Sequence, residues 1–521
     1  MFRLIISKQN RISTEWIIII AFTVIKLCTP FLTDPYYDHH IDGYFHAALS
    51  DKLDWGFISV PPSIAVFSKL SFILFGKGDF ALRFFPALVG GISVLLIGAS
   101  VKEMGGKKTA MLIACSAFLI SPSFLRSNNF LTPNPFDQFY WLLASYLIIR
   151  LIKTENTIFW IYLGIVFGIA FMNKYSFGFL AFAFLIALAI SSKRKLISSK
   201  YFICGIFIGF AIVLPNLIWQ ANHNWPVLFH MKVLYKSQLI HVQVTQFLLM
   251  QILMNLPSFG IWLFGLFYLL FSKKASDFKI LGMIYVIVVV EMLIFKGKFY
   301  YIIGIYSILL AAGAVAIEEF WNKKHELLKW GVLSFMIVTG LFLIPFGLPV
   351  LKEDAMIKYC RFLKNIGIIE PMRWNNGEIH DFPHDYAIMT GSRHLGEMAI
   401  GVFNKLDQNE KDDCFIYCGT YGIASIVKFF GDKNGLPAPI CYEDNFVLWD
   451  PENMNKNVMI YINYHQGSFL DYFNCKVKVG EISNANSFLN GVEIFLCKDP
   501  STDFRDYYHK VTSEMKNNFR Q

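Results

Sequence analysis

The chain has few charged residues for its length. Only 16% of its 521 residues are Asp, Glu, Lys or Arg, whereas 55% are hydrophobic. A soluble protein of this size would rarely be so apolar. A bilayer core about 30 Å thick needs roughly 20 apolar residues per helix. Because backbone groups in lipid must be satisfied internally, the long apolar runs predict helices rather than open sheets. The composition therefore predicts a polytopic α-helical membrane protein.

Several common motifs are missing. The sequence has no Walker loop, no GxGxxG, no heptads and no internal repeat, so no nucleotide site is expected. No small-residue cleavage site follows the first apolar stretch, which indicates a retained first helix rather than a signal peptide. The formal charge of +9 is spread largely over short loops, as topology requires, so we expect no nucleic-acid partner.

About eleven transmembrane helices are predicted from Ile17 to Val350. Their approximate ranges are 16–33, 81–101, 110–126, 135–152, 158–172, 175–191, 201–219, 246–271, 279–295, 299–318 and 329–350. A further apolar segment, 61–77, is short and opens with two prolines, which favours a position along the membrane interface.

Every second loop is short and basic. The residues concerned are Arg3, Lys8 and Arg11; Lys102, Lys107 and Lys108; Arg150 and Lys153; Lys193, Arg194, Lys195 and Lys200; Lys273, Lys274 and Lys279; and Lys323, Lys324 and Lys329. The positive-inside rule assigns these loops and the N-terminus to the cytoplasm. The loops 34–60, 126–137 and 220–245 are then outside, as is everything after Val350 if the helix count is odd.

From residue 351 the long apolar runs stop. The stretch 413–431 predicts a strand, a glycine turn and a helix, and 457–464 and 491–498 predict further strands. We therefore expect a transmembrane domain, 1–350, and a soluble extracytoplasmic α/β domain, 351–521. Its six cysteines, Cys360, Cys414, Cys418, Cys441, Cys475 and Cys497, are either disulfide partners or buried small hydrophobic residues. Cys414 and Cys418 have no second matching pair, which argues against zinc.

The outer loops carry the candidate chemistry. The first contains five Asp and three His; its carboxylates are either general bases or helix caps in a solvated loop. In the second, Asp137 is either an N-cap or an ionisable residue facing a cavity. Lys174, Lys298 and Arg83 could bind a lipid-linked phosphate, although a single Lys is more often a snorkelling anchor.

The chain resembles bacterial membrane glycosyltransferases of family 39, the group related to protein O-mannosyltransferases and lipid A aminoarabinose transferases within the GT-C superfamily. The resemblance extends over some 450 residues. The matching stretches are DGYFHAALSDKLDWGFISVPPS, FGKGDFALRFFPALVGG, LTPNPFDQFYW, GIAFMNKYSFGFL, LPNLIWQANHNWP, KGKFYYIIGIYSILLAAGAVAIEE and CGTYGIASIVKFFGDKNGLPAPICYEDNFVLWDP.

The resemblance implies transfer of a sugar from a polyprenyl-phosphate donor to an acceptor at the outer face. Asp42 matches the family's key first-loop Asp, and Asp137 matches the acidic residue of the second loop. The sequence also departs from the family: Gly43 replaces the second acid of an Asp-Glu pair, and Ser59-Val60 replaces Asp-His before the two prolines. No cofactor is firmly predicted; a divalent metal is left open, and these departures weaken the case for it.

The resulting hypothesis is a glycosyltransferase of the inner membrane. Asp42 takes or orients the acceptor's proton, and Asp137 is the second candidate catalytic residue. Lys174, Lys298 and Arg83, with Tyr300 and Tyr301, bind the donor. The acceptor is a lipid, a glycan or a protein. The alternatives are a transporter or lipid flippase, which would have charges within helix centres and related halves, and a membrane anchor for a binding domain.

Overall fold

A computed structural model of the chain describes residues 13–320, 326–374 and 377–518. The predictions for Arg3, Lys8, Arg11, Lys323 and Lys324 lie outside these residues. The chain divides into two compact units, and each is described by itself. The first contains Met1–Thr33, Arg83–Leu217 and Val233–Val350; the second contains Asp34–Leu82, Ile218–Lys232 and Leu351–Gln521. The predicted domain boundary at residue 350 stays a prediction.

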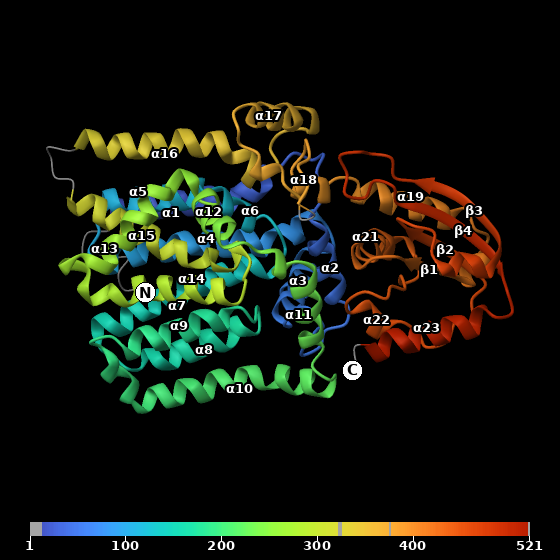
Figure 1. Cartoon of the computed structure of the whole chain (residues 1–521), viewed down its shortest axis with the longest axis horizontal. Helices are drawn as coiled ribbons and strands as arrows, with labels where there is room; N and C mark the ends of the chain where they lie inside the picture. Colours follow the sequence, from blue (N-terminus) through green and yellow to red (C-terminus); the bar gives the residue numbers. More distant parts are fainter. Residues whose placement is uncertain (1–12, 321–325, 375–376, 519–521) are drawn as a thin grey trace. The chain divides into compact units, whose positions relative to one another are not determined.

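The first unit is built from apolar helices, several of which run along a common direction (Figure 1). They are α1 (Thr14–Cys28), α4 (Asp79–Glu103), α5 (Lys108–Ile120), α6 (Pro122–Ser127), α7 (Pro133–Thr154), α8 (Phe159–Phe171), α9 (Phe177–Ala189), α10 (Lys200–Asn222), α12 (Val244–Leu253), α13 (Phe259–Phe271), α14 (Lys279–Ile294), α15 (Ile303–Phe320) and α16 (Glu326–Gly347). All eleven predicted segments are helical over most of their length.

Five helices are long and apolar enough to cross a membrane, or six if a bent pair forms one span. They are Thr14–Phe31, Asp79–Glu103, Lys200–Asn222, Phe299–Phe320 and Trp330–Gly347, and the bent pair is Val244–Leu253 with Leu256–Phe271. Shorter apolar helices of 10–17 residues include α5, α8 and α9. An integral membrane protein is supported, whereas the count of eleven spans is not confirmed.

Prolines explain where the helices are interrupted. The predicted helix 110–126 stops at Ser121 and restarts at Pro122, the first residue of α6. The predicted helix 246–271 bends by 75° between α12 and α13, where Pro257 lies in a short 3-10 turn. Proline lacks the N–H that would continue the helical ladder, and it is tolerated in a first turn.

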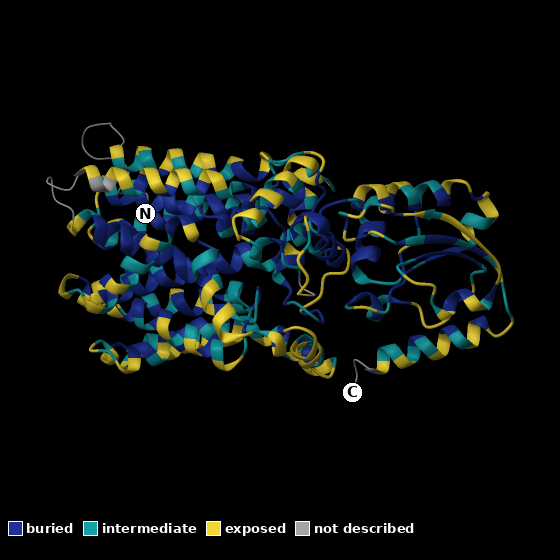
Figure 2. Ribbon diagram, turned by 45° about the horizontal axis from the view of Figure 1, so that its top comes forward, coloured by how far each residue is buried: buried dark blue, intermediate teal, exposed yellow. Residues whose placement is uncertain are grey.

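Glycine allows α8 and α10 to pack backbone to backbone. A Cβ on Gly164 would lie 2.1 Å from the carbonyl oxygen of Gly205, and a Cβ on Gly205 would lie 2.3 Å from that of Trp160. Small residues at helix crossings permit this approach in membranes. α10 and α16 carry many exposed residues, whereas α15 is largely buried; Figure 2 draws buried residues in dark blue and exposed residues in yellow.

The second unit surrounds a four-stranded sheet with helices. Its other elements are α2 (Ile41–Leu49), α3 (Ser63–Phe75), α17 (Glu353–Asn365), α18 (His384–Ile388), α19 (Ser392–Asn404), α20 (Gln408–Asp412), α21 (Tyr421–Gly431), α22 (Phe446–Trp449) and α23 (Phe504–Asn518). Three helices, α4, α10 and α11 (Pro226–Ser237), have residues in both units. The strands are β1 (Cys414–Cys418), β2 (Val458–Asn463), β3 (Phe473–Glu481) and β4 (Glu493–Pro500).

The strand order is β1-β2-β4-β3. β1 pairs in parallel with β2, Ile416 opposite Ile460, and the β2–β4 and β3–β4 pairs are antiparallel. Alternate residues of β1 and β2, including Phe415 and Tyr461, enter a core with Phe504 and Tyr508 of α23. The remaining residues of both strands are also mostly buried, as expected for a sheet covered on both faces.

The cysteines form no disulfides. All nine cysteines of the chain lie in the described residues and are free, and five of the six after residue 351 are buried. Of the two readings of these residues, the structure therefore agrees with small hydrophobic side chains, except that Cys475 is exposed.

Candidate functional site

Asp42 lies in the first turn of α2. Residues 34–49 belong to the second unit, and the helix is capped by His40, whose Nδ1 accepts a hydrogen bond from the backbone N–H of Asp42 at 3.2 Å. The start of a helix favours a negative charge because the backbone N–H groups there have no intrahelical partners. The Asp42 carboxylate is therefore held at a helix N-terminus, with 40% of its side chain exposed.

A tyrosine from the C-terminal part of the chain contacts this carboxylate. The hydroxyl of Tyr421, the first residue of α21, donates to Asp42 Oδ1 at 3.1 Å. The negative charge of Asp42 is the largest cause that raises the pKa of Tyr421 well above its usual value. Asp42 Oδ2 lies 3.6 Å from His40 Nδ1, beyond hydrogen-bond distance.

Two more carboxylates belong to the same surroundings. Glu443 accepts a hydrogen bond from the backbone N–H of Tyr421 at 3.0 Å. Asp444 interacts with the Ser59 hydroxyl, and burial raises the pKa of Asp444 to about 6, to which the charges of Glu443 and Asp42 contribute. Ser59 is one of the residues at which this chain departs from the family. The structure thus brings acidic residues of 443–444 next to a first loop that lacks the family's second acid.

Asp38 anchors the first loop at another helix start. Gly391, in the left-handed region at φ 94°, precedes α19 without a side-chain cap. The buried Asp38 carboxylate takes that place: its Oδ2 accepts from the backbone N–H of Arg393 at 2.9 Å. The Arg393 side chain also contacts the Asp79 carboxylate at 3.2 Å, and His39 Nε2 lies 3.4 Å from the Asp79 carboxylate. Two acids of the loop are therefore tied to the starts of α19 and α21.

In the first unit, Asp137 and Lys174 form a buried pair. Asp137 Oδ2 lies 3.7 Å from Lys174 Nζ, and only 2% of the Asp137 side chain is exposed. Trp141 Nε1 donates to Asp137 Oδ1 at 3.1 Å, and Lys174 Nζ donates to Asn134 Oδ1 at 2.8 Å. Asp137 is not an N-cap, because α7 begins at Pro133 with Thr132 as its cap.

The predicted donor-binding tyrosines lie beside Lys174. Its ammonium nitrogen is 4.8 Å from the ring centre of Tyr301 and 5.6 Å from that of Tyr300, which are cation–π distances. Lys298 lies 5.9 Å from the ring centre of Tyr300 and donates to Gln238. The structure therefore brings Asp137, Lys174, Lys298 and both tyrosines together.

Arg83 has different neighbours. Its side chain is buried, and its Nη1 donates to the backbone oxygen of Pro30 at 3.2 Å and to Asn129 Oδ1. Both acceptors belong to the protein, as expected for a charged group that is buried inside the fold. Its assignment to the donor phosphate stays a prediction.

Sequence reasoning missed four residues around the first loop: Tyr421, Arg393, Glu443 and Asp444. Three of them lie in stretches quoted for the resemblance, but nothing in local spacing connects them with Asp42. The acidic pair Glu443-Asp444, shortly after a buried strand-like segment, was the only signal available. Because the carboxyl ends of parallel strands often carry sites, that pair could have been singled out.

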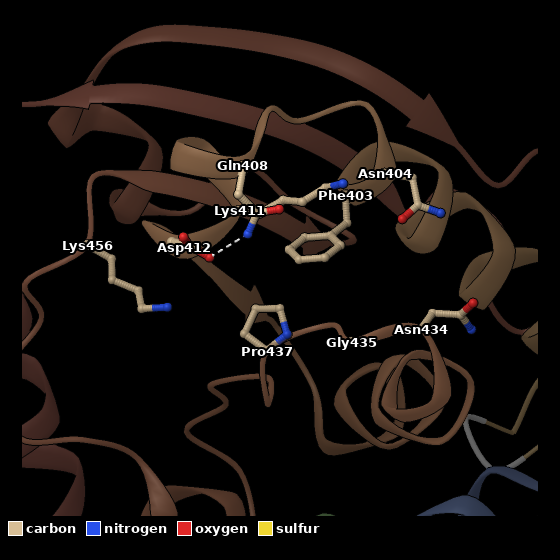
Figure 3. Close-up of a pocket in the computed structure, with 9 residues that line it drawn as sticks. All are labelled: Phe403, Asn404, Gln408, Lys411, Asp412, Asn434, Gly435, Pro437 and Lys456. Atoms are coloured by element: carbon tan, nitrogen blue, oxygen red, sulfur yellow. Dashed lines mark hydrogen bonds between the residues drawn. The ribbon is translucent and has the colours of Figure 1, made fainter.

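A shallow hollow of about 450 Å³ lies elsewhere in the second unit (Figure 3). Its lining is polar, and Gln408 Nε2 donates to Asp412 Oδ1 at 2.9 Å there. None of the predicted site residues lines it. Within the described parts of the chain, no three His, Cys, Asp or Glu residues are grouped so that they could hold a metal ion.

Comparisons with known proteins bear on one segment of the sequence and on the fold. Residues 59–219 match the family described as dolichyl-phosphate-mannose-protein mannosyltransferase. The structure is similar to that of apo ArnT from Cupriavidus metallidurans, with a TM-score of 0.58 and 14% identity, over 93% of this chain and 98% of that one. The chain therefore has a fold similar to that of ArnT. The family resemblance stated from the sequence is therefore confirmed.

The fold is also similar to that of an archaeal protein. An archaeal oligosaccharyltransferase, AglB from Archaeoglobus fulgidus, solved with an inhibitory peptide and a dolichol-phosphate, gives a TM-score of 0.50 at 11% identity, over 86% of this chain and 69% of that one. No curated protein sequence matches the chain. The matched segment 59–219 includes Arg83, Asp137 and Lys174, whereas Asp42 and Lys298 lie outside it.

Proposed function

We propose that this protein transfers a sugar from a polyprenyl-phosphate donor to a lipid, glycan or protein acceptor of the cell envelope, with Asp42 as the base. The family match over 59–219 and the GT-C fold support this reaction class. The proposed setting is the inner membrane, with the N-terminus in the cytoplasm and the segment from residue 351 outside.

The exposure of the two candidate carboxylates supports Asp42 as the base. Asp42 keeps 40% of its side chain exposed, so an acceptor hydroxyl or amine can come within hydrogen-bond reach. Asp137 is 2% exposed, and its two oxygens face Trp141 and Lys174. A carboxylate enclosed in this way has no access to an acceptor. We therefore assign Asp137 to positioning Lys174 rather than to catalysis.

The transfer step follows from these assignments. The acceptor oxygen or nitrogen attacks the anomeric carbon, and Asp42 takes the proton that the acceptor loses. The bond between the anomeric carbon and the phosphate oxygen breaks, and its electron pair leaves with the polyprenyl phosphate. One displacement inverts the anomeric configuration. Lys174 and Lys298, grouped around Tyr300, would stabilise the charge that develops on the departing phosphate.

The decisive experiment compares envelope glycolipids and glycoproteins by mass spectrometry in cells with the protein, without it, and with Asp42→Asn. We expect a mass difference of one sugar that disappears without the protein and with Asp42→Asn. Asp54→Asn is the matched control, because Asp54 lies in the same loop and its Oδ1 accepts from the backbone N–H of Trp55. Normal transfer by Asp42→Asn would remove Asp42 from the mechanism.

The proposed sidedness has its own test. Reporter fusions at His40 and Asn134 should both report the outer face of the membrane. Fusions on opposite sides would separate the two groups of site residues and contradict the proposed reaction.

One observation favours the second candidate, a transporter or lipid flippase. Glu291 in α14 is 5% exposed, and neither of its carboxylate oxygens has a hydrogen-bond partner among the described residues. Ionisable residues inside membranes often mark transport pathways. Glu291→Gln discriminates the two: a transporter should lose lipid or solute translocation, whereas the transferase should keep sugar transfer.

A further inference from the structure

The contact between Asp42 and Tyr421 joins two distant parts of the sequence within the second unit. The residues are 379 positions apart, and the phenol hydroxyl donates to Asp42 Oδ1 at 3.1 Å. A terminal carboxylate torsion is broad and roughly two-fold, so the group turns easily when nothing holds it. A donor fixed on Oδ1 restricts that rotation and fixes the direction of the lone pairs on Oδ2.

The packing of α2 against α21 makes this contact specific. A Cβ on Gly422 would lie 2.7 Å from Ile41 Cγ2, so glycine is needed where the two helices approach. The ring of Tyr421 also contacts that of Phe45, with centroids 5.1 Å apart. The neighbours of Asp42 and Tyr421 along the chain thus fix the distance across which the hydroxyl reaches the carboxylate.

We propose that the segment after residue 351 completes the reaction centre, with Tyr421 as the positioning residue that orients the Asp42 carboxylate for proton transfer. This inference rests on the proposed role of Asp42. Tyr421 occupies Oδ1, so Oδ2 is the oxygen that takes the acceptor's proton. The phenol also stabilises the ionised form of Asp42, which is the form that a base requires.

Other ionisable groups face the same carboxylate. His40 Nδ1 is 3.6 Å from Asp42 Oδ2, and protonation of His40 would place a positive charge there. Asp444 and Glu443 surround Tyr421 and add negative charge. A pH profile therefore combines contributions from these groups, so the hydroxyl must be isolated by comparing matched variants.

The test removes only that hydroxyl. Tyr421→Phe in the full-length protein, reconstituted with its donor and acceptor, keeps the ring contact with Phe45. A hydrogen bond to a charged group is typically worth enough to lower kcat by about tenfold or more. We expect that loss with the KM for the donor unchanged within about twofold.

Tyr508→Phe is the matched control. Its hydroxyl is in the same unit and donates at 2.9 Å to a backbone oxygen, that of Pro451, rather than to a carboxylate. This variant should keep kcat and the pH profile of the wild type. Equal changes in both variants would indicate a general loss of structure and would overturn the positioning role of Tyr421.

A second pair of variants keeps the hydroxyl and alters its distance. Gly422→Ala should push α21 away from α2 and lower kcat, and Ile41→Ala combined with Gly422→Ala should restore much of it by making room for the new methyl group. If the double variant is as slow as Gly422→Ala, the spacing argument fails.

The two levels of the proposal fail differently. Full transfer by Asp42→Asn would defeat the proposed function itself. If Asp42→Asn abolishes transfer and Tyr421→Phe keeps both the wild-type kcat and its pH profile, the proposed function survives and the positioning role of Tyr421 is refuted.

Discussion

Removing the charge of Asp137 alone should destabilise the protein more than removing Asp137 and Lys174 together. Asp137→Asn leaves the Lys174 ammonium 17% exposed with Asn134 as its remaining hydrogen-bond partner. Lys174→Met leaves the Asp137 carboxylate with Trp141 Nε1 as its donor. In both cases one charge stays in a buried environment without its counter-charge.

The expected loss of stability follows from the burial of the ion pair. Breaking a buried ion pair by removing one partner typically costs about 3–5 kcal/mol, whereas replacing both partners by residues of similar volume is often neutral. We expect about 3 kcal/mol for Asp137→Asn, because Lys174 keeps Asn134 and some solvent contact. The loss for Lys174→Met should be similar. For Asp137→Asn combined with Lys174→Met we expect a loss of less than about 1.5 kcal/mol.

The assay is a double-mutant cycle on purified protein in detergent, read as melting temperature and, where unfolding is reversible, as the free energy of unfolding. The two single variants should melt several degrees below the wild type, and the double variant should recover most of that loss. If the two single losses simply add in the double variant, Asp137 and Lys174 are not coupled and the ion-pair reasoning is refuted.

The kinetics of the same variants distinguish positioning from catalysis. If Asp137 only holds Lys174, Asp137→Asn should mainly raise the KM for the donor and lower kcat by less than about tenfold. A general base contributes about 10²–10⁴-fold. A kcat loss of that size, with an unchanged KM, would return Asp137 to the catalytic role first predicted for it.

Three further predictions concern other parts of the chain. Gly205→Ala should lower the free energy of unfolding by about 1–3 kcal/mol, and with it the melting temperature, because its new Cβ clashes with the backbone of Trp160. Gly260→Ala, whose Cβ meets no atom within 4 Å, should change neither. Burial raises the pKa of Asp450 to about 8. Between about pH 4 and pH 8, Asp450 is therefore protonated in the folded protein but ionised in the unfolded chain, so stability falls as the pH rises through that range. Asp450→Asn should melt at a higher temperature than the wild type at pH 7.5 and at a similar temperature near pH 4. Arg393→Ala, which leaves the buried Asp38 without its side-chain partner, should speed hydrogen exchange of residues 38–42 and lower transfer; unchanged exchange would contradict the anchoring of this loop.

The sequence predicted the helices well because each is a long apolar run. Their interruptions were visible in principle: Pro122 follows Ser121 inside the predicted helix 110–126, and Pro257 lies inside 246–271. A proline within a periodic run often ends a helix. The two segments were nevertheless predicted as single helices, because their apolar runs continue across the proline. The number of membrane crossings is harder to predict, because α5, α8 and α9 are apolar yet shorter than a full span.

Three of the four strands after residue 351 were predicted, and β3 was missed. β3 is exposed along most of its length, with Lys476 and Lys478 among its residues. It pairs only with β4 among the described strands, so it is an edge strand. Lysine on an edge strand discourages pairing with a strand of another chain. An amphipathic, charged edge strand has too little hydrophobic signal to be recognised by composition.

Some residues of the candidate site were predicted from the sequence and others were not. Asp42 and Lys174 were found through segments that resemble a known family. Tyr421 and Arg393 could not be found, because each acts on the first loop through a contact that spans more than 350 positions. Local spacing carries no information about such a pairing. Only the folded structure shows which residue of the C-terminal segment faces which carboxylate.

The hydrogen bond between Asp42 and Tyr421 also has a consequence for biosynthesis. The ribosome makes Asp42 early, and 379 further positions must follow before its partner exists. During that interval the first loop lacks the helix starts that hold Asp38 and Asp42, so a growing or prematurely terminated chain has no ordered base. With the inferred role of Tyr421, such a chain stays inactive until residue 421 has been made and α21 has packed against α2.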